Sequence, residues 1–152
     1  MTARRASAAD AAAFAALDAR AGAGGWSQAT YRELLSEPGS VGMLWEGAGF
    51  ALLQIAADVA DVLMVAVDPD QRRKGIARTC LSAAMAEAQA GGVTRVLLEV
   101  AQGNTGARAL YEAMGFAEVA VRKGYYSSGP HAGEDALVMA LGLDGLERSG
   151  LS

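Results

Sequence analysis

Residues 65–78 carry the arrangement of charge and glycine best suited to chemistry in this chain. A hydrophobic run ends at Val67, a Pro-containing turn follows at residues 68–70, and Gly75 precedes a helical pattern that continues to about residue 90. The cations around that glycine are Arg72, Arg73, Lys74 and Arg78. Positive side chains have the wrong sign for a helix N-terminus, so their crowding favours a bound anion such as phosphate. An ordinary helix start with solvated basic residues is the alternative.

Glu99 is the second candidate for chemistry. It shares one face of the apolar strand pattern of residues 94–100 with Leu97, and both faces of that pattern are otherwise apolar, as in a strand covered on both sides. A carboxylate in such a place costs free energy unless it is paired or useful. The sequence leaves open a functional carboxylate, a Glu that reaches solvent at the end of the strand, and a Glu paired with an arginine.

Bulk properties exclude several classes of protein. A length of 152 residues with 52% hydrophobic residues favours one domain with a full core. The net charge of −4 and a pI of about 5.0 argue against general nucleic-acid binding. With Cys80 as the single cysteine and His131 as the single histidine, neither an internal disulfide nor a metal cluster is expected. No signal peptide or membrane-spanning run is recognised, so we expect a cytoplasmic protein.

Hydrophobic periodicity and turn signals predict the elements that position these residues. Ser7 with Asp10, Ser27 and Asn104 are placed as helix caps, and Trp26 with Tyr31 is placed as a hydrophobic staple. The expected helices cover residues 7–21, 27–35, 75–90 and 105–114, and the expected strands cover 2–5, 41–46, 49–57, 60–67, 94–100, 117–126 and 135–141. Residues 1–141 form the predicted domain, and residues 142–152 form a poorly ordered tail.

Two segments resemble the signatures of the GNAT superfamily of N-acetyltransferases. R-R-K-G-I-A at residues 72–77 resembles its Q/R-x-x-G-x-G/A motif. LLEVAQGNTGARALYEAMGF at residues 97–116 resembles its second signature and is most similar to the ribosomal-protein-alanine N-acetyltransferase branch. Three further matches to that branch are Trp26-Ser27, Tyr125-Tyr126 and Gly133-Glu134-Asp135, so the resemblance covers about residues 8–141.

The resemblance implies a mixed α/β fold with a mixed sheet, in the order β-α-α-β-β-β-α-β-α-β-β. It implies an acetyl-CoA-dependent enzyme, without a metal, whose acceptor is a protein N-terminal α-amine of the ribosomal-protein-alanine kind. Acetylation of a small amine or a lysine, and a non-catalytic acyl-CoA-binding module, are the alternatives. Gly25, where the branch usually has proline, and Met64, where a polar residue often stands, put the protein acceptor in doubt more than the reaction.

The resemblance also implies roles for single residues. Glu99 corresponds to the general base, and Tyr111 to the acid that protonates the coenzyme A thiolate. A backbone N–H of Val65, Ala66 or Val67 corresponds to the oxyanion donor, and this strand to the one that pairs with the pantetheine arm. The resemblance assigns binding of the coenzyme phosphates to Arg72, Arg73, Lys74, Gly75, Ile76, Ala77 and Arg78.

Four residues are implied at the acceptor side, namely Trp26, Tyr125, Tyr126 and Glu134. Since strand residues alternate between faces, only one of the two tyrosines can point into an acceptor cleft. Asn104 is implied as a hydrogen-bond partner of the coenzyme. Simpler interpretations remain for each of these positions: Tyr111 as a packing residue, Asn104 as a helix cap, Trp26 as a staple and Glu134 as the start of the last strand.

Overall fold

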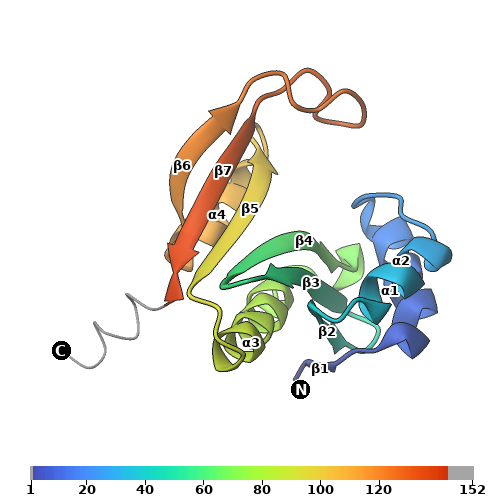
Figure 1. Ribbon diagram of the computed structural model, residues 1–152. Helices are drawn as coiled ribbons and strands as arrows, with labels where there is room; N and C mark the ends of the chain where they lie inside the picture. Colours follow the sequence, from blue (N-terminus) through green and yellow to red (C-terminus); the bar gives the residue numbers. More distant parts are fainter. Residues whose placement is uncertain (1, 144–152) are drawn as a thin grey trace. The chain divides into compact units, whose positions relative to one another are not determined.

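The computed structural model describes residues 2–143, which separate into two compact units (Figure 1). The first unit ends at Val93 and the second begins at Thr94. The predicted tail lies outside the described residues except for its first two. Gly142 ends the last strand, and the N–H of Leu143 donates to the carbonyl of Thr94 over 2.8 Å. No helix within residues 2–143 is long and apolar enough to cross a membrane.

The first unit is an antiparallel sheet with helices on both faces. Its strands lie in the order β1 (Arg4–Arg5), β2 (Ser40–Trp45), β3 (Gly49–Ala56) and β4 (Val59–Val67). Its helices are η1 (Ala8–Asp10), α1 (Ala11–Ala21), α2 (Gln28–Ser36), η2 (Pro69–Gln71) and α3 (Ile76–Ala90). Phe50 and Leu52 belong to a core cluster with α1 and α2, whereas a Cβ on Gly49 would meet Ile76 of α3. The period of two therefore gives the helices opposite faces of the sheet.

Aromatic packing joins α1 and α2 to the sheet of this unit. Phe14, Tyr31 and Phe50 are fully buried, and the rings of Phe14 and Phe50 stack with their centroids 4.1 Å apart. The Tyr31 ring lies 5.7 Å from that of Phe14 and 5.6 Å from that of Phe50. Burial of such rings stabilises the unit by about 1.5–3 kcal/mol for each side chain removed from water.

Local capping signals define the helix starts as predicted. Ser7 and Asp10 form a reciprocal capping box, and the Ser27 hydroxyl accepts from the N–H of Thr30. Trp26 and Tyr31, with centroids 5.6 Å apart, form the staple across the start of α2. Asn104 caps the helix of the second unit by accepting from the N–H of Ala107.

The second unit contains three antiparallel strands and one helix. The strand order is β5 (Arg95–Ala101), β7 (Ala136–Gly142) and β6 (Ala117–Arg122), with α4 (Thr105–Ala113) between β5 and β6 in the chain. The order of helices and strands agrees with the predicted order, apart from the two short 3-10 helices. The predicted strand 117–126 is too long, because β6 ends at Arg122 and Tyr125 and Tyr126 lie in the loop that follows.

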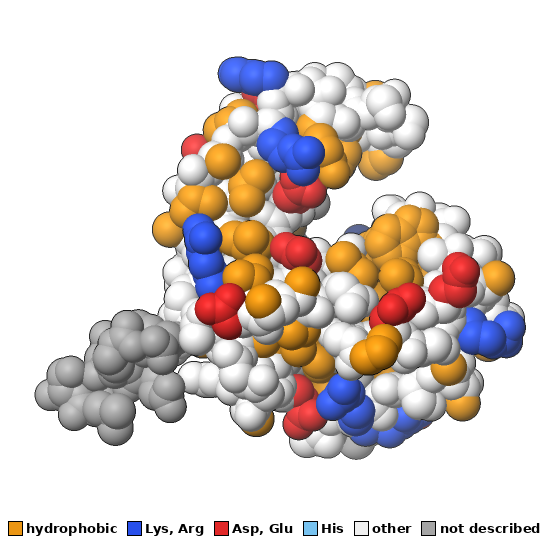
Figure 2. Space-filling model, in the orientation of Figure 1, with side chains coloured by type: hydrophobic (Ala, Val, Ile, Leu, Met, Phe, Trp, Pro, Cys, Tyr) orange, Lys and Arg blue, Asp and Glu red, His pale blue; other side chains and the backbone are white. Residues whose placement is uncertain are grey.

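β6 forms one edge of this three-stranded array, and all of its residues are exposed. Val119 is 51% exposed and Val121 is 42% exposed. Hydrophobic side chains lie on the surface of this unit, with basic and acidic side chains among them (Figure 2).

Candidate active site

In the first unit, β4 leads into a turn and then into α3. Asp68 caps η2 by accepting from the N–H of Asp70 over 3.0 Å, and its other oxygen accepts from the Arg20 guanidinium over 2.9 Å. The Asp70 N–H and the Arg20 charge hold the pKa of the Asp68 carboxyl below its usual value. These contacts fix the start of the loop to the last turn of α1.

The remainder of this loop takes a backbone path that most residues disfavour. Arg73 has φ of 67° and Gly75 has φ of 73°, both in the left-handed region. Gly75 stands directly before Ile76, the first residue of α3, so the first N–H groups of the helix have no partner within it. Lys74 donates to Gln71 over 2.9 Å. The loop therefore places cations beside helix N–H groups that have no partner within the helix. This combination is typical of a phosphate-binding site.

The residues of the predicted phosphate loop do not all face solvent in the same way. The side chains of Arg72, Arg73, Lys74 and Arg78 are exposed. Ile76 is only 3% exposed, so its side chain belongs to the core and only its backbone could face a ligand. The sequence motif alone did not separate these two kinds of position.

The backbone of β4 distinguishes among its three candidate N–H groups. Asp68 donates its N–H to the carbonyl of Ala48 over 2.7 Å, and Ala66 lies opposite Phe50 two residues further back. In an antiparallel ladder every second pair exchanges hydrogen bonds, so the N–H of Ala66 points toward β3. The N–H groups of Val65 and Val67 then point to the other edge of β4. This excludes Ala66 as an oxyanion donor.

A β-bulge on β4 lies just before these residues. Leu52 pairs with Met64, but Leu53 pairs with Val62, so Leu63 is an extra residue on β4. Bulges bend a strand and change which way the following groups point, and they are common beside functional sites. The sequence contains no signal that places this bulge.

In the second unit, Glu99 lies on β5 and forms an ion pair with Arg122 of β6. The Arg122 Nη1 lies 2.5 Å from the Glu99 Oε2, and the Glu99 side chain is 31% exposed. Hydrogen bonding to Glu99 raises the pKa of the Arg122 guanidinium. The expectation that both faces of this strand are covered is therefore wrong at Glu99. The alternative in which this Glu is paired with an arginine is confirmed, and that pairing leaves a catalytic role untested.

Two tyrosines of the loop after β6 lie near this ion pair. The Tyr125 ring is 43% exposed and stacks under the Arg122 guanidinium, 4.5 Å from its carbon to the ring centroid. The Tyr126 ring is 5.2 Å from that of Tyr125 and is less exposed. Burial, and then the charge of Glu99, raise the pKa of Tyr126. The two neighbouring tyrosines thus have different surroundings, but the alternation argument does not apply to them because they lie in a loop and not in a strand.

Tyr111 of α4 lies in the same unit as Glu99. Burial, with an added contribution from Tyr126, raises its pKa to about 12. Its ring packs edge-on against Phe116, with centroids 5.9 Å apart. The second unit therefore contains a carboxylate, a phenol that stays protonated at neutral pH, and a second tyrosine whose pKa is raised.

Glu134 is already engaged within its own unit. Its carboxylate accepts from the N–H of Gly103 over 2.6 Å and lies 2.8 Å from Nδ1 of His131. The His131 side chain and the Gly103 N–H lower the pKa of Glu134. Glu134 therefore connects the loop before β7 to the loop after β5. His131 is half-buried and paired with Glu134.

The sequence analysis missed two residues that contact candidate residues: Arg122, which binds Glu99, and Asp18, which binds Trp26. Asp18 of α1 is completely buried and accepts from the N–H of Trp26 over 3.0 Å. The signal that could have indicated Asp18 is a carboxylate that directly follows Leu17, which is buried, and precedes a glycine-rich loop.

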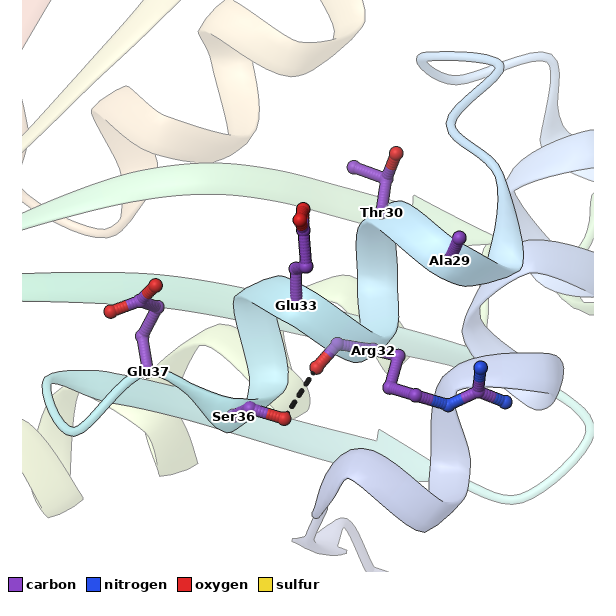
Figure 3. A pocket seen from close by; sticks show the side chains of 6 residues that line it. All are labelled: Ala29, Thr30, Arg32, Glu33, Ser36 and Glu37. Atoms are coloured by element: carbon purple, nitrogen blue, oxygen red, sulfur yellow. Dashed lines mark hydrogen bonds between the residues drawn. The ribbon is translucent and has the colours of Figure 1, made fainter.

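An open depression lies along α2, outside this group of residues. Its lining comes from α2 and the residue that follows it, namely Ala29, Thr30, Arg32, Glu33, Ser36 and Glu37 (Figure 3). The hydrogen bond drawn there joins the Ser36 hydroxyl to the carbonyl of Arg32 over 2.6 Å. None of the predicted site residues lines it.

Comparison with known proteins shows the family to which the chain belongs. Residues 12–116 match the family model described as the acetyltransferase (GNAT) family. The chain therefore belongs to the GNAT acetyltransferase family. The [ribosomal protein bS18]-alanine N-acetyltransferase of Escherichia coli K12 is 42% identical over 94 residues, which are 62% of this chain and 63% of that relative.

Solved structures extend the similarity along the chain. The crystal structure of the ribosomal-protein-S18-alanine N-acetyltransferase from Escherichia coli has a TM-score of 0.82 at 32% identity and covers 93% of both chains. An acetyltransferase structure from Salmonella typhimurium with its cofactor acetyl-CoA has a TM-score of 0.77 at 24% identity, covering 95% of this chain and 94% of that one. This second likeness shows the fold alone.

Proposed function

We propose that the protein transfers the acetyl group of acetyl-CoA to the N-terminal α-amine of a protein, of the kind that begins with alanine. The observation that carries this proposal is that Glu99, Tyr111 and Tyr126 all lie in one compact unit of a chain that belongs to the GNAT family. The likeness to a ribosomal-protein-alanine N-acetyltransferase over 93% of both chains supports the choice of acceptor.

The loop between β4 and α3 would hold the pyrophosphate of the coenzyme. The first N–H groups of α3 supply donors, and Arg72, Arg73, Lys74 and Arg78 supply opposite charge. Asn104 is engaged as the cap of α4, and a contact with the coenzyme would use its remaining hydrogen-bonding groups.

The thioester carbonyl would receive a hydrogen bond from β4. Val65 and Val67 have N–H groups that point away from β3, so we assign the oxyanion donor to one of these two residues. A donor of this kind stabilises the negative charge that develops on the carbonyl oxygen during attack.

The acceptor amine needs modest help to become a nucleophile. An α-amine has a pKa near 8, so about a tenth of it is neutral at pH 7. The nitrogen attacks the carbonyl carbon and forms the amide bond as the carbon–sulfur bond breaks. Glu99 would take the amine proton, directly or through a water. Its Oε2 is bound by the Arg122 guanidinium, which would compete with the incoming ammonium for the carboxylate.

Tyr111 would act on the leaving sulfur. Its pKa of about 12 keeps the phenol protonated. Full transfer to a thiolate whose conjugate acid has a pKa near 8.5 is uphill by roughly 5 kcal/mol. We therefore assign Tyr111 chiefly the role of a hydrogen-bond donor to the sulfur, with proton transfer completed as the product leaves.

The acceptor class is tested by mass spectrometry of peptides incubated with acetyl-CoA and the protein. The panel contains a peptide that begins with alanine, the same peptide with a blocked N-terminus and an internal lysine, and a polyamine. We expect a gain of one acetyl group at the free alanine terminus. Acetylation of the lysine peptide or the polyamine alone would refute the proposed acceptor, and the absence of any transfer would refute the enzyme.

A further inference from the structure

Asp18 binds backbone N–H groups of the loop between α1 and α2. This loop, residues 22–27, is here called the acceptor loop (Figure 1). One carboxylate oxygen accepts from the N–H groups of Gly24 and Gly25, over 2.9 and 2.7 Å. The other accepts from the N–H of Trp26 over 3.0 Å and from the hydroxyl of Tyr31 over 2.6 Å. The backbone carbonyl of Asp18 also accepts from the N–H of Ala23. A single residue thus binds four consecutive N–H groups.

The hydrogen bonds compensate for the burial of this charge. Asp18 is 0% exposed, and burial by itself raises the pKa of a carboxyl. The Tyr31 hydroxyl and the three loop N–H groups more than offset this effect, so the pKa of Asp18 lies below its usual value. The ionised carboxylate is therefore the form that holds the loop.

The loop is held against β4 just before the proposed thioester-binding residues. A Cβ on Gly24 would lie 2.4 Å from the Met64 methyl group and 3.3 Å from Nε1 of Trp26. Gly25 has φ of 70°, which favours glycine. The Trp26 ring then packs against Tyr31, the same residue whose hydroxyl binds Asp18. The buried Asp18 carboxylate thus fixes Trp26 in two ways. It binds the Trp26 N–H directly, and it binds the hydroxyl of Tyr31, against which the Trp26 ring packs.

We propose that Asp18 is a positioning residue for the acceptor, acting through Trp26 and the acceptor loop and leaving coenzyme binding unchanged. This inference rests on the proposed function and on the predicted position of Trp26 at the acceptor side. Trp26 is half-buried, with part of its side chain left for contact. The acceptor loop adjoins Met64, the residue before Val65. It is therefore placed to contact a substrate peptide whose amine approaches Val65 and Val67.

The test compares D18N and Y31F with wild type, with D10N as the matched control. In D18N the new amide N–H₂ replaces an oxygen that two donors face, so the Trp26 N–H loses its partner. Y31F removes one donor and keeps the ring. D10N removes another helix-associated carboxylate of the same unit, bound to Ser7 and Arg4 and remote from the acceptor loop in its contacts.

For D18N we expect KM for an alanine-terminal peptide to rise by about tenfold or more, the range for a lost hydrogen bond to a charged group. The Kd for acetyl-CoA, from calorimetry, should stay within about twofold of wild type, because the contacts of Asp18 with Trp26 and Tyr31 do not involve the residues of the phosphate loop, 72–78. Y31F should give a smaller rise in KM, and D10N none. A folded D18N with unchanged peptide KM, or with equal losses in peptide KM and acetyl-CoA affinity, overturns the inference.

A second readout does not depend on the acceptor. In a W45F background, acrylamide quenching of Trp26 fluorescence should increase in D18N, and unchanged quenching would overturn the inference whatever the activity. If wild type acetylates a different amine, the proposed acceptor fails, and the same KM comparison with that amine decides the role of Asp18.

Discussion

The Arg122 guanidinium on β6 reaches past β7 to the Glu99 carboxylate on β5, with 2.5 Å between Nη1 and Oε2. The Tyr125 ring lies under the same guanidinium. The residue proposed as the base is therefore bound to a cation, and an incoming ammonium group would take the place of that cation. Because the pair is exposed to solvent, it contributes little to stability.

Replacing Glu99 by Gln should lower kcat by roughly 10²–10⁴ at pH 7, the usual range for loss of a general base. Part of the rate should return as pH rises, because the α-amine then loses its proton unaided. Steady-state kinetics from pH 7 to pH 9.5 measures both effects. R122Q is the matched control, since it breaks the same ion pair and keeps the carboxylate. Equal losses in E99Q and R122Q would mean that the pair matters only as a structural contact.

Tyr111→Phe should fold and bind acetyl-CoA as wild type does, because the ring and its contact with Phe116 remain. We expect its kcat to fall by about 10- to 100-fold, at or below the lower end of the range for acid–base catalysis, since water can also protonate the thiolate. Single-turnover acetyl transfer is the measurement. Y126F provides the comparison, and a larger loss there than in Y111F would assign the donor to Tyr126.

The pKa of Tyr111 also predicts a pH dependence. Since burial raises this pKa to about 12, the phenol keeps its proton throughout the neutral and alkaline range. The tyrosine-dependent part of kcat, measured as the ratio of wild type to Y111F, should stay constant up to about pH 10.5 and fall only as pH approaches 12. A ratio that falls near pH 9 would contradict the donor role.

Gly75→Val should raise the Kd for acetyl-CoA by about tenfold or more. Valine at φ of 73° is strained, and its branched side chain enters the space beside the helix N–H groups. Calorimetry gives the affinity. G92V is the control, because Gly92 also has positive φ and open space around its Cβ position but follows the C-terminus of α3. Similar losses of affinity in both variants would indicate strain alone.

The lowered pKa of Asp18 predicts how stability changes with acid. Its folded-state pKa lies below the unfolded value of about 3.9, so the carboxylate contributes its full stabilisation above about pH 5. That contribution is lost as pH falls through the folded-state pKa. Urea unfolding should therefore show a difference in free energy between wild type and D18N that is largest near pH 7 and smaller at pH 3. A difference that does not depend on pH would show that the charge is not what stabilises the loop.

The sequence by itself determined the features that depend on neighbours along the chain. The caps at Ser27 and Asn104 join groups three residues apart, and the staple of Trp26 and Tyr31 joins groups five apart. The start of α3 after Gly75 follows from a backbone conformation that glycine adopts most readily. Such signals can be read from residue types because their partners lie within one or two turns of helix.

Tertiary structure alone decided which distant groups meet. Arg122 meets Glu99 because β7, the last strand in the chain, lies between β5 and β6. The bulge at Leu63 sets which residues of β4 turn their N–H groups away from β3. Strand order and register follow from the packing of whole faces, since a shift of one residue reverses every side chain on a strand. No local pattern near Glu99 or Val65 contains that information.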